Sequence, residues 1–367
     1  MQKKVVLLLA ALFVLFLSAC DGYVYAFTPY NSSGADEVHI GVVYPVAMRD
    51  MDTFFYRGIE LAISRINERG GVLGKPLRTL IRDDENDSHL AMQIANTFSE
   101  QGITAVIGHW STDISTFLAD VYEANGVVMM TPAASGTNLF ESKYNYIYRM
   151  SANHYVFAKV MAEYLYDVGL SRVAVIYSDD EFGINFAAIL EQELSRLGII
   201  VVDRSIGITP ASVGTIMERW RAFGCDGIIM ATSMAHIIEP IKILQSAGNT
   251  LPIFGGDSFN RHDLPEILGE YANMVYSLTF ALDALDPDFL EAFRTTYGHD
   301  PDIRAITGYM AVNLIADAIE AKGTTDSTAI AEFLSQLQNH PTIKGELSYN
   351  PETQEFEHLK VVVRRLG

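Results

Sequence analysis

Short apolar segments alternate with amphipathic segments along most of the chain, and this alternation constrains the fold more than any other feature. Residues 105–137 show it most clearly. Residues 105–107 are apolar and β-branched, as expected for a parallel strand covered on both faces. A helix with apolar residues at helical spacing is expected to begin at Ser111, and residues 127–131 form the next buried strand. Repetition of this order predicts an α/β fold with parallel sheets.

The alternation continues through two blocks of sequence, one before and one after residue 150. The expected strands lie at 38–43, 77–83, 105–107, 127–131, 172–177, 199–204, 227–230, 252–255 and 273–277. Three helices, at 286–297, 303–321 and 327–337, follow without a clear strand between them. Two short segments, 345–349 and 360–364, close the chain as further strand candidates.

Two turns rich in small and hydroxyl side chains follow consecutive strands of the first block. Ser111 and Thr112 begin a helix, where unpaired N–H groups and the helix dipole can hold a carboxylate. The turn at Ala133–Ser135 offers carbonyls to an ammonium group and the Ser135 hydroxyl as donor or acceptor. Isolated Ser and Thr residues more often act only as caps and turn formers. Two such turns at one sheet edge nevertheless favour a ligand-binding site.

The first residues have the pattern of an export signal. Lys3 and Lys4 precede thirteen apolar residues, 5–17, which is shorter than the roughly 20 residues that a membrane-spanning helix needs. Residues 17–20, Leu-Ser-Ala-Cys, resemble a bacterial lipobox, so a signal peptide of residues 1–19 and a lipid on Cys20 are expected. Asp21 resembles the signal that keeps some lipoproteins on the inner membrane. An ordinary signal peptide is the alternative.

Composition narrows the partners of the exported chain. Cys225 is the only cysteine besides Cys20, so a lipidated Cys20 leaves no intramolecular disulfide. The formal net charge is −19 at pH 7, which argues against nucleic acid and against a polybasic membrane surface. Residues 20–36, rich in Gly, Ser, Asn and Tyr, are expected to tether the lipid to the domain.

Common catalytic and metal-binding motifs were not found in the sequence. The nearest match to a phosphate loop, residues 70–76, has the wrong glycine spacing and runs from helix to strand. The acidic run at 83–87 lacks the EF-hand spacing and is expected to cap the following helix. His109 has no nucleophile pattern beside it, so a hydrogen-bonded loop histidine is expected. No cofactor, no metal and no enzymatic activity are therefore expected.

Several short motifs together resemble one family of exported proteins. They are Gly-Gly-Val-Leu-Gly-Lys-Pro at 70–76, Asp-Asp at 83–84, Val-Ile-Gly-His at 106–109, Met-Thr-Pro-Ala-Ala-Ser at 130–135, Tyr-Arg-Met at 148–150 and Gly-Gly-Asp at 255–257. In these motifs residues 38–367 resemble solute-binding proteins of the leucine/isoleucine/valine-binding type. That family has the type I periplasmic-binding fold.

The resemblance implies two doubly wound parallel-sheet lobes that close on a ligand. Three crossovers are expected, near Met150, Thr279 and Lys344. Residues 37–149 and 279–343 would form the first lobe, and residues 150–278 and 344–367 the second. The chain would deliver its ligand to an ABC permease in the inner membrane.

The resemblance also implies roles for individual residues. The carboxylate of a ligand would meet Thr112 and Ser111, and its ammonium would meet the turn at Ala133 and Ser135. The residues implied in the second lobe are an aromatic wall, Phe182, and an acidic partner of the ammonium, Asp257.

Departures from the family pattern at Trp110, Met51 and Arg304 point to residues that could set ligand specificity, and Ser233 is a further candidate. Trp110 could narrow the pocket or stack on a flat ligand. Arg304 or Arg49 could meet an acidic or polar side chain, and a solvated surface position is the alternative for both. The expected ligand is a small amino acid. Amides, urea-like molecules and aromatic acids remain alternative ligands. An alternative function is that of a ligand sensor for a membrane signalling protein.

Overall fold

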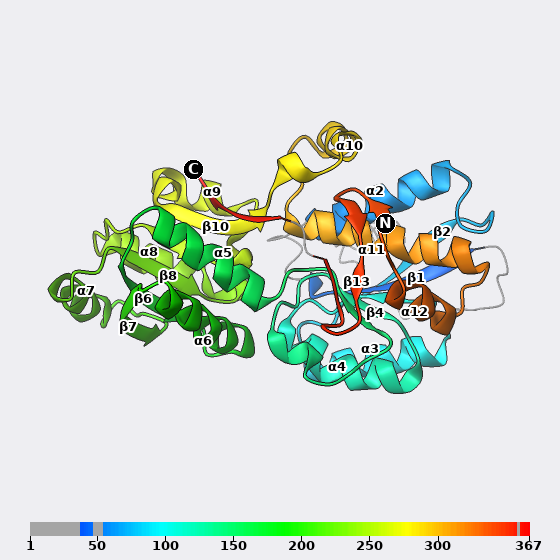
Figure 1. Cartoon of the computed structure of the whole chain (residues 1–367), viewed down its shortest axis with the longest axis horizontal. Helices are drawn as coiled ribbons and strands as arrows, with labels where there is room; N and C mark the ends of the chain where they lie inside the picture. The colour runs from blue at the N-terminus through cyan, green and yellow to red at the C-terminus, as the bar shows by residue number, and fades with distance from the viewer. Residues whose placement is uncertain (1–36, 47–53, 358–359) are drawn as a thin grey trace, which may run out of the picture. The chain divides into compact units, whose positions relative to one another are not determined.

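The computed structural model describes residues 37–46, 54–357 and 360–367 (Figure 1). The expected signal peptide, the tether, Cys20, Arg49 and Met51 lie outside the described residues. All the described residues belong to one compact unit. Within these ranges, none of the helices has both the length and the apolar character that crossing a bilayer requires.

A five-stranded, fully parallel sheet forms the first lobe (Figure 1). Its order is β2-β1-β3-β4-β5, and successive side chains of a strand point to opposite faces. Val106 and Met129 lie in one core cluster, whereas the next residues, Ile107 and Met130, lie in the other. Both faces are therefore buried. The strands are β1 (Val38–Val43), β2 (Leu77–Arg82), β3 (Val106–Ile107), β4 (Met129–Thr131) and β5 (Ile147–Arg149).

Helices cover both faces of this first sheet. Helices α3 (Ser88–Glu100) and α4 (Thr112–Asn125) bury Phe98 and Leu118 in one cluster. The other cluster holds Ile59 of α2 (Phe54–Glu68), which packs along α11. The remaining helices of the first lobe are α10 (Pro287–Tyr297), α11 (Ile303–Lys322) and α12 (Ser327–Ser335).

A six-stranded sheet of order β15-β10-β9-β8-β6-β7 forms the second lobe. Its strands are β6 (Arg172–Tyr177), β7 (Ile200–Ile206), β8 (Gly227–Ala231), β9 (Ile253–Gly255), β10 (Val275–Phe280) and β15 (Val361–Arg365). All pairs are parallel except β10 with β15, which is antiparallel. The sheet is thus parallel except at one edge. Its helices are α5 (His154–Asp167), α6 (Glu181–Arg196), α7 (Val213–Ala222), α8 (Ile238–Ser246) and α9 (Leu264–Leu268).

Short elements complete the chain. The 3-10 helices that lie wholly within the described residues are η2 (Thr137–Phe140), η3 (Met234–His236), η4 (Asp257–Phe259), η5 (Gly269–Met274) and η6 (Leu282–Ala284). Two antiparallel hairpins pair β11 (His340–Thr342) with β12 (Gly345–Leu347) and β13 (Tyr349–Asn350) with β14 (Glu355–Phe356).

The second hairpin corrects the expected boundary between the lobes at residue 344. The Tyr148 ring of β5 lies 5.6 Å from the Tyr349 ring and 5.8 Å from the Phe356 ring, measured between centroids. Burial of these aromatic rings keeps the hairpin on the first lobe. Among the described strands after residue 343, only β15 pairs with the second sheet, so the hairpin of β13 and β14 is not part of that sheet.

A buried ion pair fixes the same hairpin to the end of β5. The Arg149 guanidinium lies 2.5 Å from Glu355 Oε1, and the two side chains are 1% and 9% exposed. Arg149 Nη1 also donates to the carbonyls of Ala134, at 3.3 Å, and Gly136, at 2.6 Å. The guanidinium thereby holds the turn that follows β4.

We expect Arg149→Met to lower the free energy of unfolding by about 3–5 kcal/mol, because it removes the guanidinium that compensates the charge of the buried Glu355 carboxylate. Urea denaturation of the mature protein measures the change. Arg196→Met is the matched control, since Arg196 is half exposed in its pairs with Glu163 and Glu193, and it should cost less than about 1 kcal/mol. Equal, small losses in both variants would show that the buried pair does not stabilise the fold.

Candidate ligand-binding site

A cavity of about 250 Å³ lies where strands of both sheets end. Parallel strands bring their carboxyl ends to one edge of a sheet, and loops at that edge bind ligands in open α/β folds. The volume is just below the roughly 300 Å³ at which typical small-molecule sites begin, which suits a small ligand. The lining residues are Asn86, Trp110, Ser111, Thr112, Asp113, Ala133, Asp180, Phe182, Ser233, Met234, Ala235, His236, Asp257, Ser258 and Arg304.

The amino end of α4 forms one polar end of this cavity. The Ser111 hydroxyl caps the helix by accepting a hydrogen bond from the Ile114 N–H at 3.3 Å. The Thr112 hydroxyl accepts from the Gly136 N–H at 3.2 Å, which leaves its proton available to donate. Gly136 suits this approach, since an added Cβ would lie 2.3 Å from Thr112 Cγ2. The helix dipole and the hydroxyl donors favour an anionic group here.

The turn after β4 contributes less to the cavity than the sequence suggests. Ala133 lines the cavity, but Ser135 does not. The Ser135 hydroxyl lies 3.0 Å from His154 Nε2, and the Ser135 carbonyl accepts from the His154 N–H at 2.9 Å. Both polar groups of Ser135 that were expected to meet a ligand therefore hold the turn against α5.

Asp257 forms the opposite polar end. It follows β9 in η4 and is 1% exposed. No well-aligned hydrogen bond reaches either carboxylate oxygen from the described residues, although the backbone N–H groups of Asp257 and Ser258 act on the carboxylate and Oδ2 lies 3.3 Å from the Arg304 guanidinium. Burial raises the pKa of the Asp257 carboxyl, and the Arg304 charge opposes this shift. Gly255 is required just before it, because an added Cβ would lie 2.0 Å from the Phe259 ring.

The candidate specificity residues that the structure describes, Trp110, Ser233 and Arg304, line the cavity, as does Phe182. Arg304 is 3% exposed, so the surface alternative is wrong, and its guanidinium carbon lies 5.6 Å from the centre of the Trp110 ring. The Trp110 ring packs edge-on against Phe55 at 5.5 Å. Phe182, from the first turn of α6, contacts the His154 ring edge-on at 4.9 Å. Ser233, which follows β8, completes the set.

The acidic residues Asp113 and Asp180 line the cavity although the sequence did not assign them to the site, and Glu181 follows Asp180 in the chain. Asp113 lies in the first turn of α4, and Asp180 caps α6 by accepting from the Gly183 N–H at 2.8 Å. Glu181 begins α6, and burial, followed by the nearby Asp113 charge, raises its pKa to about 7. These acids occupy ordinary helix-start positions, so the sequence pattern accounts for them as caps.

His109 has the structural role expected of it. It is fully buried, with Nδ1 2.7 Å from Asp84 Oδ2 and Nε2 3.1 Å from the Tyr122 hydroxyl. Its carbonyl accepts from the hydroxyls of Ser115 and Thr131, each at 3.0 Å. These bonds fix the loop that leads into α4. Within the described ranges, no group of three or more His, Cys, Asp or Glu side chains is arranged to hold a metal ion.

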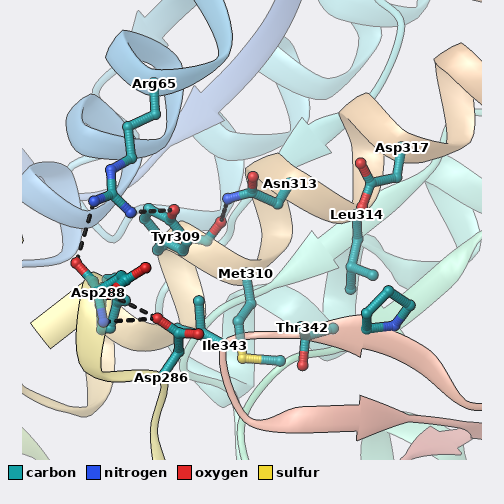
Figure 2. A pocket seen from close by; sticks show the side chains of 12 residues that line it. Arg65, Asp286, Asp288, Tyr309, Met310, Asn313, Leu314, Asp317, Thr342 and Ile343 are labelled. Atoms are coloured by element: carbon teal, nitrogen blue, oxygen red, sulfur yellow. Dashed lines mark hydrogen bonds between the residues drawn. The ribbon is translucent and has the colours of Figure 1, made fainter. Parts of the chain in front are cut away.

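A second cavity, of about 340 Å³, lies away from these residues (Figure 2). It is formed by α2, α10, α11 and the segment around β11, and the Arg65 guanidinium donates there to the Tyr309 hydroxyl at 3.3 Å and the Asp288 carbonyl at 3.1 Å. The carboxylates of Asp286 and Asp317 also line it. None of the residues expected to bind ligand lies on this cavity, so the cavity between α4 and η4 is the better candidate.

The fold belongs to a known family. Residues 37–364 match the family model of periplasmic binding proteins, and the chain belongs to that family. The fold is the type I periplasmic-binding fold, with two α/β lobes.

Solved structures show which members are similar. The chain is 31% identical to the ABC transporter substrate-binding protein from Desulfitobacterium hafniense in complex with Leu, with a TM-score of 0.81; the match covers 90% of this chain and 98% of that one. A leucine binding protein from Thermotoga maritima is 23% identical, with a TM-score of 0.79 and coverage of 89% and 94%. The latter likeness shows the fold.

A relative compared by sequence alone is also an amino-acid-binding protein. The leucine-, isoleucine-, valine-, threonine- and alanine-binding protein of Pseudomonas aeruginosa is 24% identical over 329 residues, which cover 87% of each chain. The alignment thus spans both lobes.

We expect the buried His154 to make the protein less stable as the pH falls. Burial lowers the pKa of His154 to about 3, whereas an unfolded histidine titrates near 6.5. Between these values the unfolded chain binds a proton that the native chain does not. The free energy of unfolding should therefore fall by up to about 1.4 kcal/mol per pH unit from about pH 6.5 towards pH 3.

Urea denaturation of the wild type and of His154→Gln over this pH range tests the effect. The variant should have a shallower slope, whereas the exposed control His89→Gln should match the wild type. Identical slopes in all three proteins would mean that His154 is not held neutral in the native state.

Proposed function

We propose that this chain is the solute-binding component of an ABC importer and that it binds a small amino acid in the cavity between α4 and η4. The family is shown by the match over residues 37–364. A relative that is 31% identical, from Desulfitobacterium hafniense, is an ABC transporter substrate-binding protein in complex with Leu. The proposal carries this type of ligand and this transport role over to the present chain.

The observation that carries the proposal is the pair of opposite polar ends on one small cavity. The start of α4, with the Thr112 hydroxyl, favours a carboxylate. Asp257 offers a buried carboxylate whose Oδ1 receives no well-aligned hydrogen bond from a described residue, which favours an ammonium group. Phe182 and Trp110 supply apolar surface between them. A zwitterion with a small side chain matches this arrangement.

The two ends come from different lobes. Thr112 belongs to the lobe of β1 to β5, whereas Asp257 and Phe182 belong to the lobe of β6 to β10. A ligand that contacts both ends binds the closed arrangement more tightly than an open one, so it shifts the lobes towards closure. An ABC permease that recognises the closed arrangement would then receive a loaded protein.

An enzymatic function is less well supported by this cavity, although the side chains of Ser233, His236 and Asp180 lie close to one another. The Ser233 hydroxyl and the Asp180 carboxylate approach the same ring nitrogen, Nδ1 of His236, at 2.9 and 3.5 Å. In a catalytic triad the nucleophile and the acid contact different nitrogens of the histidine. This geometry does not let His236 take the serine proton while the carboxylate holds the ring, and we infer binding without turnover.

Export and anchoring form a separate part of the proposal. Residues 1–19 would be the signal peptide, and a lipid on Cys20 would hold the protein on the periplasmic side of the inner membrane, beside the permease. Cys20→Ala should move the protein from the membrane to the soluble fraction on cell fractionation. Cys225→Ala, the control, should stay with the membrane. A wild-type protein that is itself soluble would contradict the lipid anchor.

Ligand-dependent thermal stabilisation tests the amino-acid proposal. L-leucine at about 100 times its dissociation constant should add about 2.7 kcal/mol of stability to the wild type. Thr112→Val removes a hydroxyl donor to the carboxylate, and Asp257→Asn removes the partner of the ammonium. Each variant should weaken binding at least tenfold, or about 1.4 kcal/mol.

Asp317→Asn is the matched control, since Asp317 lies on the cavity of Figure 2. It should bind L-leucine as tightly as the wild type. If only aromatic acids or uncharged amides stabilise the wild type, or if Asp257→Asn binds leucine unchanged, the amino-acid assignment is wrong. Loss of binding in Asp317→Asn alone would move the site to the other cavity.

A further inference from the structure

The Asp257 carboxylate already has a cationic partner within the protein. Arg304 Nη2 lies 3.3 Å from Asp257 Oδ2 and donates to the Asp257 carbonyl at 3.2 Å. Both side chains are buried, at 4% and 1% exposure. Arg304 belongs to the first turn of α11, on the first lobe, and Asp257 to η4, on the second. The pair therefore joins the two lobes across the cavity.

Arg304 is held in place by its own lobe. Its backbone N–H donates to Asp302 Oδ1 at 3.0 Å, within the cap of α11. Its guanidinium lies over the Trp110 ring, a favourable position for a cation on an aromatic face. Residues of the first lobe thus fix the guanidinium beside Asp257, which belongs to the second lobe.

A binding site that contains a buried carboxylate normally requires a cationic group on its ligand. A ligand that lacks the ammonium leaves such a carboxylate desolvated and unpaired, and this cost rejects the ligand. Sites that depend on a polar group of the ligand can reject analogues without it by factors of about 10⁴ or more. Here Arg304 compensates the Asp257 charge whether or not the ligand carries an ammonium.

We propose that Arg304 is a specificity-determining residue, whose pairing with Asp257 lets the site accept small carboxylates with a hydroxyl in place of the α-ammonium. A 2-hydroxy acid would place its carboxylate at Thr112 and its hydroxyl near Asp257 Oδ1, to which it can donate. An α-ammonium group would use the same oxygen. The inference rests on the proposed function, because it takes the carboxylate end of the ligand from it.

Charged groups elsewhere on the cavity do not replace Arg304. Asp113 of α4 and Asp180 at the start of α6 are both acidic, and His236 of η3 lies against Asp180, with its Nδ1 3.5 Å from Asp180 Oδ2. Removing the Arg304 charge would therefore leave Asp257 without a cation from the described cavity residues, so that the ligand would have to supply one.

The test compares L-leucine with (S)-2-hydroxy-4-methylpentanoate, which has the same shape but no ammonium. Calorimetry at pH 7.5 gives both dissociation constants. In the wild type they should differ by no more than about tenfold, whereas in Arg304→Gln leucine should bind at least about a hundredfold more tightly than the hydroxy acid. Arg304→Lys, which keeps the charge, should restore a smaller difference. A hundredfold preference already present in the wild type, or an unchanged ratio in Arg304→Gln, overturns the proposal.

Arg304→Gln leaves a buried carboxylate unpaired and risks misfolding, so a second variant is included. Asp257→Asn/Arg304→Gln removes both charges, and it should bind the hydroxy acid at least as tightly as leucine, because an ammonium group then meets no carboxylate. A double variant that still prefers leucine a hundredfold would contradict the proposal.

Failure of the proposed function is recognised separately. If the wild type binds neither compound, the amino-acid assignment is wrong, and small-angle X-ray scattering of the ligand-free protein tests the pair itself. Arg304→Gln should then have a larger radius of gyration than the wild type, because a tie between the lobes is lost. An unchanged radius of gyration would overturn the role given to Arg304.

Discussion

A buried carboxylate must be compensated, and Asp257 is the residue on which the candidate site depends. It is 1% exposed at the end of β9, where burial alone would favour the uncharged form. The chain compensates it from the opposite lobe through Arg304. This contact joins residues of the two lobes, and both residues line the candidate ligand cavity. A site in which a protein cation compensates the carboxylate has a different ligand selectivity from a site in which only the ammonium of the ligand does so.

The parallel sheets explain why such a contact forms at all. In each lobe the carboxyl ends of the central strands lie at one edge, so the loops after β3, β4, β8 and β9 gather there. His109 and Arg149 then fix two of these loops from within, by buried hydrogen bonds to neighbouring segments. The scaffold thereby positions residues that line the cavity.

The sequence predicted the parts of the fold that depend on local pattern. The predicted alternation of strands and helices is present, although β5 was not predicted, and Thr112, Phe182 and Asp257 line one cavity. Contacts between distant segments were not predictable. The rings of Tyr349 and Phe356 pack on Tyr148 of the first lobe, although the predicted boundary placed both residues in the second lobe. The sequence could not predict this contact, because ring packing between segments about 200 residues apart leaves no periodic signal. Two further contacts of this kind were missed: the bonds that take Ser135 away from the cavity, and the Arg304–Asp257 pair, 47 residues apart.

A crystal structure of the mature protein grown with L-leucine tests the account most directly. The account predicts density for the ligand between α4 and η4. Its carboxylate should lie within hydrogen-bond distance of the Thr112 hydroxyl, its ammonium beside Asp257 Oδ1, and the Arg304 guanidinium should remain at Oδ2. A ligand bound instead in the cavity lined by Asp286 and Tyr309, or one whose carboxylate turns towards Arg304 and away from α4, would contradict it.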